Sequence, residues 1–186
     1  MGTSKRLLIV CAVVCALLTA SSALAQDNML GSKKPSVTML PPPLPVVTGG
    51  KPGEARLRFR ISPGFHINSN TPKSEFLIPT VLKLDAPTDI VVGKITYPPG
   101  EEMSFPFAPN EQLSVYSGEF TVSVLVRPLH NVVPSKYMFR GQLRYQACDN
   151  AACYPPKNLP VKFEVKVAKA PKAHAKNPAQ SPHVHH

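Results

Sequence analysis

Two cysteines, Cys148 and Cys153, stand in the stretch Tyr145-Gln-Ala-Cys-Asp-Asn-Ala-Ala-Cys-Tyr-Pro-Pro156. Four residues separate the thiols, and at this spacing a local loop can bring both sulfurs together. Tyr154 and the two prolines after it restrict the chain just beyond the second cysteine. A thiolate is both a nucleophile and a metal ligand, so the stretch has the form of a redox motif.

Three interpretations of this pair are open. A structural disulfide is the usual fate of paired cysteines in an exported protein, but so short a loop contributes only about 2 kcal/mol. A zinc or copper site would use both thiolates with His66 or His130, although zinc sites usually take four ligands at tighter paired spacings. A cycling dithiol needs one attackable sulfur and a second one close enough to resolve the intermediate.

The first 25 residues predict a signal peptide. Lys5-Arg6 gives a charged start, residues 7–18 form an apolar run, and Ala23-Leu24-Ala25 is a small-x-small cleavage site. The run is shorter than the about 20 residues that a spanning helix needs, and no later stretch is suited to span a bilayer. We therefore expect an exported protein with no transmembrane segment in the mature chain.

The composition is basic. Loss of Lys5 and Arg6 with the leader changes 21 basic and 11 acidic residues to 19 and 11, a net charge of +8, and Cys11 and Cys15 are expected to leave as well. This charge favours loose association with anionic surfaces or acidic partners. No aromatic-basic pattern recurs, which argues against nucleic acid as a partner. About 160 mature residues suit one domain, expected as a monomer.

The mature chain divides by composition into three parts. Residues 26–53 are Pro-rich and predict a flexible lead-in, with one short edge strand at 45–48. Residues 54–167 form the expected domain. Residues 168–186 consist mainly of Lys, Ala, Pro and His and predict a disordered tail. Its histidines at 174, 183, 185 and 186 have no fixed geometry for a metal, so we expect neither a metal site nor a cofactor.

Apolar and polar residues alternate through most of the domain. Strands are expected at 55–61, 76–84, 90–97, 120–126, 137–145 and 161–167. No segment of ten or more residues has helical periodicity. Six or more short strands punctuated by Pro and Gly predict an all-β, antiparallel sandwich or barrel.

Residues 101–113 lack a clean period and predict a loop. They carry Phe105 and Phe107 around Pro106. Two phenylalanines in a loop must pack on something, so they either plug one end of the core or form a lid over a site.

The cysteine stretch resembles the signature of the amino-terminal periplasmic domain of the thiol:disulfide interchange protein DsbD. Pro63-Gly-Phe-His-Ile-Asn-Ser-Asn70 and Phe76-Leu-Ile-Pro-Thr80 resemble the upstream pattern of that family, and the resemblance covers roughly residues 53–167. It implies an immunoglobulin-like antiparallel β-sandwich in the periplasm. It also implies that electrons come from a membrane-embedded donor and pass, without a cofactor, to thioredoxin-like oxidoreductases such as disulfide isomerases and the reductant of cytochrome c maturation.

Roles for individual residues follow from the same resemblance. The second cysteine of the motif bonds to partners, which makes Cys153 the attacking residue and Cys148 the resolving one. The family has a cap loop whose aromatic residue covers the cysteines, and by position Phe105 or Phe107 takes that place.

Three further residues are expected to tune the thiols. His66 stands where some family members have tyrosines after the Gly64 turn, so the resemblance implies that it lies near the sulfurs. Asp149 adjoins Cys148 and disfavours its thiolate by like charge, and Tyr154 follows Cys153.

The sequence departs from the family in one respect. No membrane-spanning conduit and no thioredoxin-like Cys-x-x-Cys segment follows residue 167, so we expect a separate protein to supply the electrons. The alternative is a non-enzymatic immunoglobulin-like interaction module with a local structural disulfide.

Overall fold

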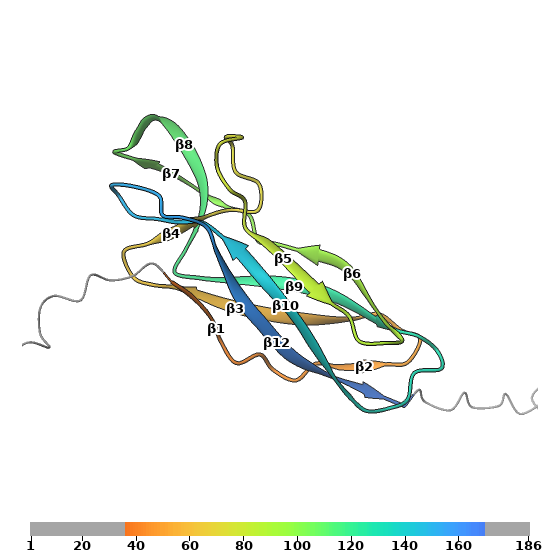
Figure 1. The fold of residues 1–186 in the computed structure, drawn as a ribbon. Coiled ribbons are helices and arrows are strands. Elements are labelled where there is room, and N and C mark those ends of the chain that lie inside the picture. The colour runs from red at the N-terminus through yellow and green to blue at the C-terminus, as the bar shows by residue number, and fades with distance from the viewer. Residues whose placement is uncertain (1–35, 170–186) are drawn as a thin grey trace, which may run out of the picture. The chain divides into compact units, whose positions relative to one another are not determined.

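A computed structural model describes residues 36–169 of the protein, which form twelve strands (Figure 1). The strands are β1 Val37–Met39, β2 Val46–Thr48, β3 Gly53–Ile61, β4 His66–Asn68, β5 Val81–Asp85, β6 Ile90–Thr96, β7 Glu101–Phe105, β8 Ala108–Ser117, β9 Glu119–Pro128, β10 Lys136–Tyr145, β11 Ala147–Cys148 and β12 Lys157–Ala168. The predicted leader, both of its cysteines and the tail histidines lie outside the described residues.

Two four-stranded sheets form the sandwich. Their strand orders are β1-β3-β9-β6 and β2-β12-β10-β5, and all pairs are antiparallel except β2 with β12. The predicted antiparallel, immunoglobulin-like β-sandwich is confirmed.

Strict alternation on the long strands creates the core between these sheets. The buried side chains are Ala55, Leu57, Phe59 and Ile61 on β3, Phe120, Val122, Val124 and Val126 on β9, Phe139, Leu143 and Tyr145 on β10, and Val161, Phe163, Val165 and Val167 on β12. Phe139 stacks on Phe163 with ring centroids 4.9 Å apart, and Phe59 stacks on Phe120 at 5.3 Å. The polar residues between them face outward, as expected for strands with one buried face.

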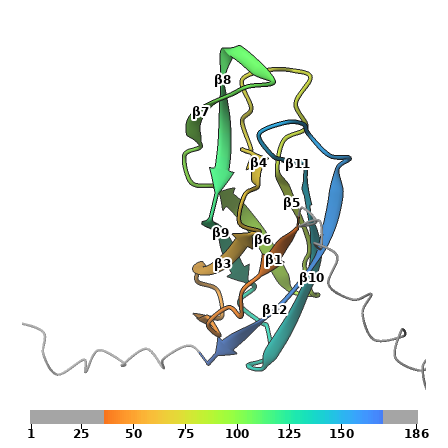
Figure 2. The same cartoon turned by 90° about the vertical axis from the view of Figure 1, so that its left-hand side faces the viewer.

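A third sheet, in the order β11-β4-β8-β7, lies at one end of the sandwich (Figure 2). Its longest strand, β8, continues into β9 of the core after one residue, Gly118. That glycine has φ 57°, a left-handed conformation that glycine adopts without steric cost. The sheet that carries Cys148, the first cysteine of the motif, is therefore built directly onto the core.

Three expectations about secondary structure need correction. The lead-in, predicted as flexible apart from an edge strand at 45–48, also contains β1, and Val37 and Val47 are buried in the core. The strand predicted at 76–84 begins only at Val81, because residues 69–80 form a loop around a turn in which the Leu77 amide donates to the Ser74 carbonyl (3.2 Å).

The third correction concerns residues 101–113, which are not a loop. They belong to the β7–β8 hairpin, whose turn is Pro106-Phe107, and Met103 pairs with Leu113.

Among residues 36–169, no helix is long and apolar enough to cross a membrane.

The alternation on β10 makes a direct prediction about stability. Phe139→Ala should lower the free energy of unfolding by about 3–5 kcal/mol, because it removes a fully buried ring and leaves a cavity against Phe163. Met138→Ala, its 43% exposed neighbour, should change it by less than about 0.5 kcal/mol. Urea unfolding of the disulfide-intact protein measures both, and equal losses would contradict the assigned faces.

Candidate functional site

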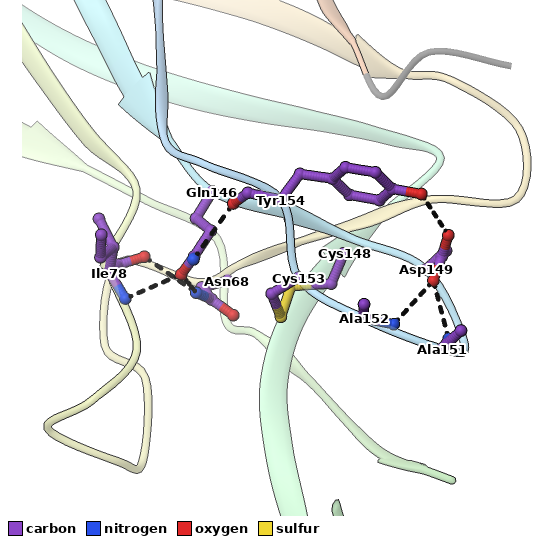
Figure 3. Close-up of a disulfide and its surroundings, with 9 residues drawn as sticks. All are labelled: Asn68, Ile78, Gln146, Cys148, Asp149, Ala151, Ala152, Cys153 and Tyr154. Carbon is purple, nitrogen blue, oxygen red and sulfur yellow. Dashed lines mark hydrogen bonds between the residues drawn. A yellow bond between two sulfur atoms is a disulfide. The ribbon is translucent and has the colours of Figure 1, made fainter. Parts of the chain in front are cut away.

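Cys148 and Cys153 form a disulfide across a tight hairpin (Figure 3). The Tyr154 amide donates to the Ala147 carbonyl (2.8 Å), and the Asp149 amide donates to the Ala152 carbonyl (3.0 Å). The cysteines lie opposite each other between these two bonded pairs, with their Cα atoms 3.9 Å apart. Such non-hydrogen-bonded positions bring opposed side chains closest together, so the backbone of the loop itself places the sulfurs side by side.

The two cysteines differ in exposure. Cys148 belongs to β11, which pairs with β4, and it is fully buried opposite His66. Cys153 lies on the outer, returning side of the hairpin and is partly exposed. Cys153 is therefore the more accessible residue of the pair.

Asp149 and Tyr154 stabilise the hairpin from within. The Asp149 carboxylate accepts hydrogen bonds from the amides of Ala151 (2.8 Å) and Ala152 (2.9 Å) and from the Tyr154 hydroxyl (2.6 Å). All three hydrogen bonds lower the pKa of Asp149, and the bond from the Tyr154 hydroxyl has the largest effect. The same carboxylate raises the pKa of Tyr154. The Tyr154 ring also packs edge-on against Phe65, with centroids 5.9 Å apart. The negative charge of Asp149, next to Cys148, is thus stabilised by hydrogen-bond donors of the same loop.

A stack of three rings lies beside Cys148. His66 faces Cys148 across the β4–β11 pair, and its imidazole stacks on Phe105 with centroids 3.9 Å apart. Phe107 stacks on the other side of Phe105 at 5.5 Å. Phe105 is buried and Phe107 is half-buried. The inner member of the predicted pair is therefore Phe105, at the tip of the β7–β8 hairpin.

His66 is the one titratable side chain in this stack. Burial lowers its pKa from 6.5 to about 4, an effect that the nearby Asp149 carboxylate opposes. Its Nε2 atom is buried and has no hydrogen-bond partner. At neutral pH the imidazole beside Cys148 is uncharged.

Two polar residues that the sequence did not single out connect this site to its surroundings. The Gln146 side-chain carbonyl accepts hydrogen bonds from the Ile78 amide (3.3 Å) and the Asn68 side chain (3.1 Å), while its amide donates to the Tyr154 carbonyl (3.2 Å). Asn68 also donates to the Ile78 carbonyl (3.0 Å). Figure 3 shows Gln146 between Ile78 and Tyr154, beside the disulfide. Gln146 fixes the segment on which Cys153 is placed.

The structure brings together most of the residues that the sequence pointed to. Both cysteines, His66, Asp149, Tyr154, Phe105 and Phe107 lie at the end of the sandwich formed by the third sheet and the hairpin of the motif. His130 does not join them, since it lies against Gly50 in the connection after β9. Within residues 36–169, no group of three or more His, Cys, Asp or Glu side chains is placed to hold a metal ion.

The arrangement supports thiol-disulfide exchange. An incoming thiolate attacks one sulfur of a disulfide and releases the other as a thiolate, so the two sulfurs must differ in access. Here Cys153 is partly exposed as a residue, and Cys148 is buried beside a neutral imidazole. The short hairpin keeps the released sulfur next to the mixed disulfide that it must later resolve.

The chain is similar to known thiol-disulfide proteins. The family described as "Thiol:disulfide interchange protein DsbD, N-terminal" matches residues 39–165. Among solved structures, the reduced DsbD N-terminal domain of Neisseria meningitidis is 28% identical, with 67% of this chain and 82% of that chain covered and a TM-score of 0.38.

A second structure, a complex between the DsbD N-terminal and PilB N-terminal domains of Neisseria meningitidis, is 24% identical, with 74% and 88% of the two chains covered and a TM-score of 0.40. No curated protein matches the chain significantly. Since the family match spans more than half of the sequence and contains both cysteines, the chain belongs to the DsbD N-terminal family and is a thiol-disulfide interchange module.

Proposed function

We propose that this protein relays electrons between redox proteins by cycling Cys148 and Cys153 between disulfide and dithiol. The observation that carries the proposal is the unequal exposure of two disulfide-bonded residues in a member of this family: Cys148 is fully buried and Cys153 is partly exposed.

The proposed cycle balances two electrons and two protons. A donor thiolate attacks Cys153, the bond between the two cysteines breaks, and Cys148 leaves as a thiolate that takes up a proton. A second donor thiolate then attacks the donor sulfur of the mixed disulfide and releases Cys153 as a thiolate, which takes up the second proton. The donor becomes a disulfide and the module a dithiol. With an acceptor disulfide the steps run in reverse: Cys153 attacks, and Cys148 resolves the intermediate.

The proposed setting is the periplasm. Residues 1–25 have the form of a cleavable signal peptide, and we propose that residues 54–167 carry the exchange domain. As partners we propose a membrane electron donor of the DsbD type and periplasmic thioredoxin-like oxidoreductases, including those of cytochrome c maturation, with the module acting as a monomer. Family membership supports this class of partner.

For the cap loop we propose that Phe105 covers the site and that Phe107 supports it. The stacking order supports this assignment: Phe105 contacts His66, which is the cross-strand neighbour of Cys148, while Phe107 lies on the outer side of Phe105. Leu113 and Val115 of β8 form a small buried cluster with Phe105, separate from the main core. The cap therefore has its own packing.

For tuning we propose that the neutral His66 and the hydrogen-bonded Asp149 set the reactivity of the thiols. A neutral imidazole does not stabilise a thiolate by charge, but it can exchange a proton with a thiol. The Tyr154 hydroxyl bound to Asp149 limits the negative potential beside Cys148.

The roles of the two cysteines are tested by trapping. Cys148→Ser should accumulate mixed disulfides with periplasmic proteins through Cys153, because the resolving sulfur is absent, and non-reducing gels with mass spectrometry identify them. Cys153→Ser is the matched control and should trap few or none, since Cys148 is buried.

Trapping only by Cys153→Ser would reverse the assigned roles. Redox titration of the unmodified protein distinguishes a disulfide that exchanges electrons from a purely structural one, because structural disulfides usually have reduction potentials below about −300 mV. We expect a higher value than this, and a much lower one would contradict the relay.

The cap is tested by the accessibility of the reduced thiols. Phe105→Ala should speed their alkylation by iodoacetamide by about tenfold, since the ring over His66 and the adjoining Cys148 is lost. Phe107→Ala should have a smaller effect, because this ring lies further out. Urea unfolding of both variants checks that the domain stays folded, and unchanged rates in both would rule out the cap.

The buried neutral state of His66 predicts a pH dependence of stability. The folded pKa of about 4 lies below the ordinary value of 6.5, so the unfolded chain takes up the proton first as the pH falls. The contribution of His66 to the free energy of unfolding therefore keeps its full value above pH 6.5. It falls by about 3 kcal/mol in total as the pH is lowered from 6.5 to about 4.

His66→Phe should remove this loss, which is measured as the difference between wild type and variant in urea unfolding across that pH range. The low pKa of Asp149 places its own titration below the window. Identical pH profiles for the two proteins would contradict a buried neutral histidine.

A further inference from the structure

Phe76 is the most exposed large hydrophobic side chain of the described residues, at 86% of its full accessibility. It lies on the 69–80 loop, next to the β7–β8 hairpin. Together with Leu77, Phe107, Pro109 and Leu113 it lines a groove of about 390 Å³, which we call the Phe76 groove. Its floor belongs to the small hydrophobic cluster that also contains Phe105.

The loop that carries Phe76 is anchored at both ends and near its middle. At one end the Ser69 and Ser114 hydroxyls are 2.8 Å apart, and at the other the Thr80 hydroxyl donates to the Asn68 carbonyl (2.5 Å). In the middle, Lys73 forms an ion pair with Glu102 of β7 (2.7 Å). These contacts hold the loop against β8, β7 and β4 on either side of the exposed ring, so the apolar edge of the groove is part of the folded structure.

The Phe76 groove is joined to the reactive disulfide by two routes. Ile78 of the same loop donates to Gln146, which in turn donates to the carbonyl of Tyr154, next to Cys153. Phe107, which lines the groove, stacks on Phe105 of the cap. Figures 1 and 2 show the loop before β5, the hairpin and the cysteine segment at the same end of the sandwich.

The rim of the groove is acidic. Glu111 lines it, and a neighbouring hollow that shares Phe76 and Glu111 also includes Glu75. Among residues 36–169 neither carboxylate forms an ion pair, whereas Lys73 is engaged by Glu102. A local negative rim on a chain with a net charge of +10 selects a positively charged contact.

We propose that the Phe76 groove docks the redox protein with which Cys153 exchanges, and that it receives an apolar side chain flanked by lysine or arginine. This inference rests on the proposed relay and specifies how the partner is recognised. Binding hot spots centre on well-packed pockets and often include an aromatic side chain, and the charged rim supplies orientation and partner selection.

Docking is tested first without any thiol chemistry. The probes are two blocked peptides with the same apolar centre, Lys-Leu-Phe-Leu-Lys and Glu-Leu-Phe-Leu-Glu, titrated into the isotope-labelled full chain with its disulfide intact. The lysine peptide should bind at least about tenfold more tightly and shift the NMR signals of residues 74–77 and 107–113. Equal affinities, or shifts confined to other surfaces, would overturn the proposal.

Variants locate the contact. Phe76→Ser should weaken binding of the lysine peptide by about tenfold, and Glu75→Gln with Glu111→Gln should reduce the difference between the two peptides. Val133→Ser is the matched control, because Val133 is 68% exposed in the connection between β9 and β10, at the opposite end of the sandwich in Figure 1. Unchanged binding by Phe76→Ser would sink the proposal.

A kinetic measurement separates this inference from the relay itself. A thiol peptide, Lys-Leu-Cys-Leu-Lys, should reduce the wild-type disulfide about tenfold faster than it reduces Phe76→Ser, while dithiothreitol should reduce both at the same rate. If neither thiol reacts, the relay fails and the peptide titration still decides docking. A concentration-dependent dimer in sedimentation that Phe76→Ser abolishes would identify a second copy as the occupant and overturn the proposed partner.

Discussion

The pairing of β11 with β4 is the constraint on which the site depends. Only two residue pairs form it, yet they bury Cys148, place His66 opposite it and leave Cys153 on the outer side of the hairpin. Shifting the register by one residue would turn these side chains to the other face of the sheet. The difference in burial between Cys148 and Cys153 thus follows from strand pairing. The loop residues between the two cysteines stabilise this arrangement by hydrogen bonding.

The molecule separates stability from reactivity. The main core lies mostly between the two large sheets and does not include the two cysteines, whereas Phe105, Leu113 and Val115 of the β7–β8 hairpin form a cluster of their own. Because interiors are densely packed, a change in one cluster is felt mainly by its direct neighbours. The side chains around Phe105 are therefore packed largely apart from those that hold the two large sheets together.

Much of this could be predicted from the sequence, because the dominant signal is alternation. The strands from Ala55 to Ile61 and from Phe120 to Val126 follow from it directly. The β7–β8 hairpin was missed, since Pro106 interrupts the pattern and most of β7 faces solvent. The lead-in strand β1 is too short to show a period.

The hydrogen bonds of Gln146 and Asn68 could not be predicted from sequence for a different reason. A single polar residue beside a cysteine carries no periodic signal, and its partners, Ile78 and Tyr154, lie at different distances along the chain. Such contacts become visible only when the 69–80 loop is placed against β11. The one sequence feature that indicates this role is the position of Gln146, a long amide side chain between the buried Tyr145 and Ala147.

The direct passage from β8 into β9 has a mechanical consequence. Gly118 is the only residue between the two strands, so the base of the hairpin cannot swing without disturbing the central strand of a core sheet. Its tip is held by side-chain packing, since Phe105 stacks on His66 and Phe107 packs with Leu77 of the 69–80 loop. A displacement at the base of the hairpin would therefore be transmitted to β9, which lies between β3 and β6 in one of the two core sheets.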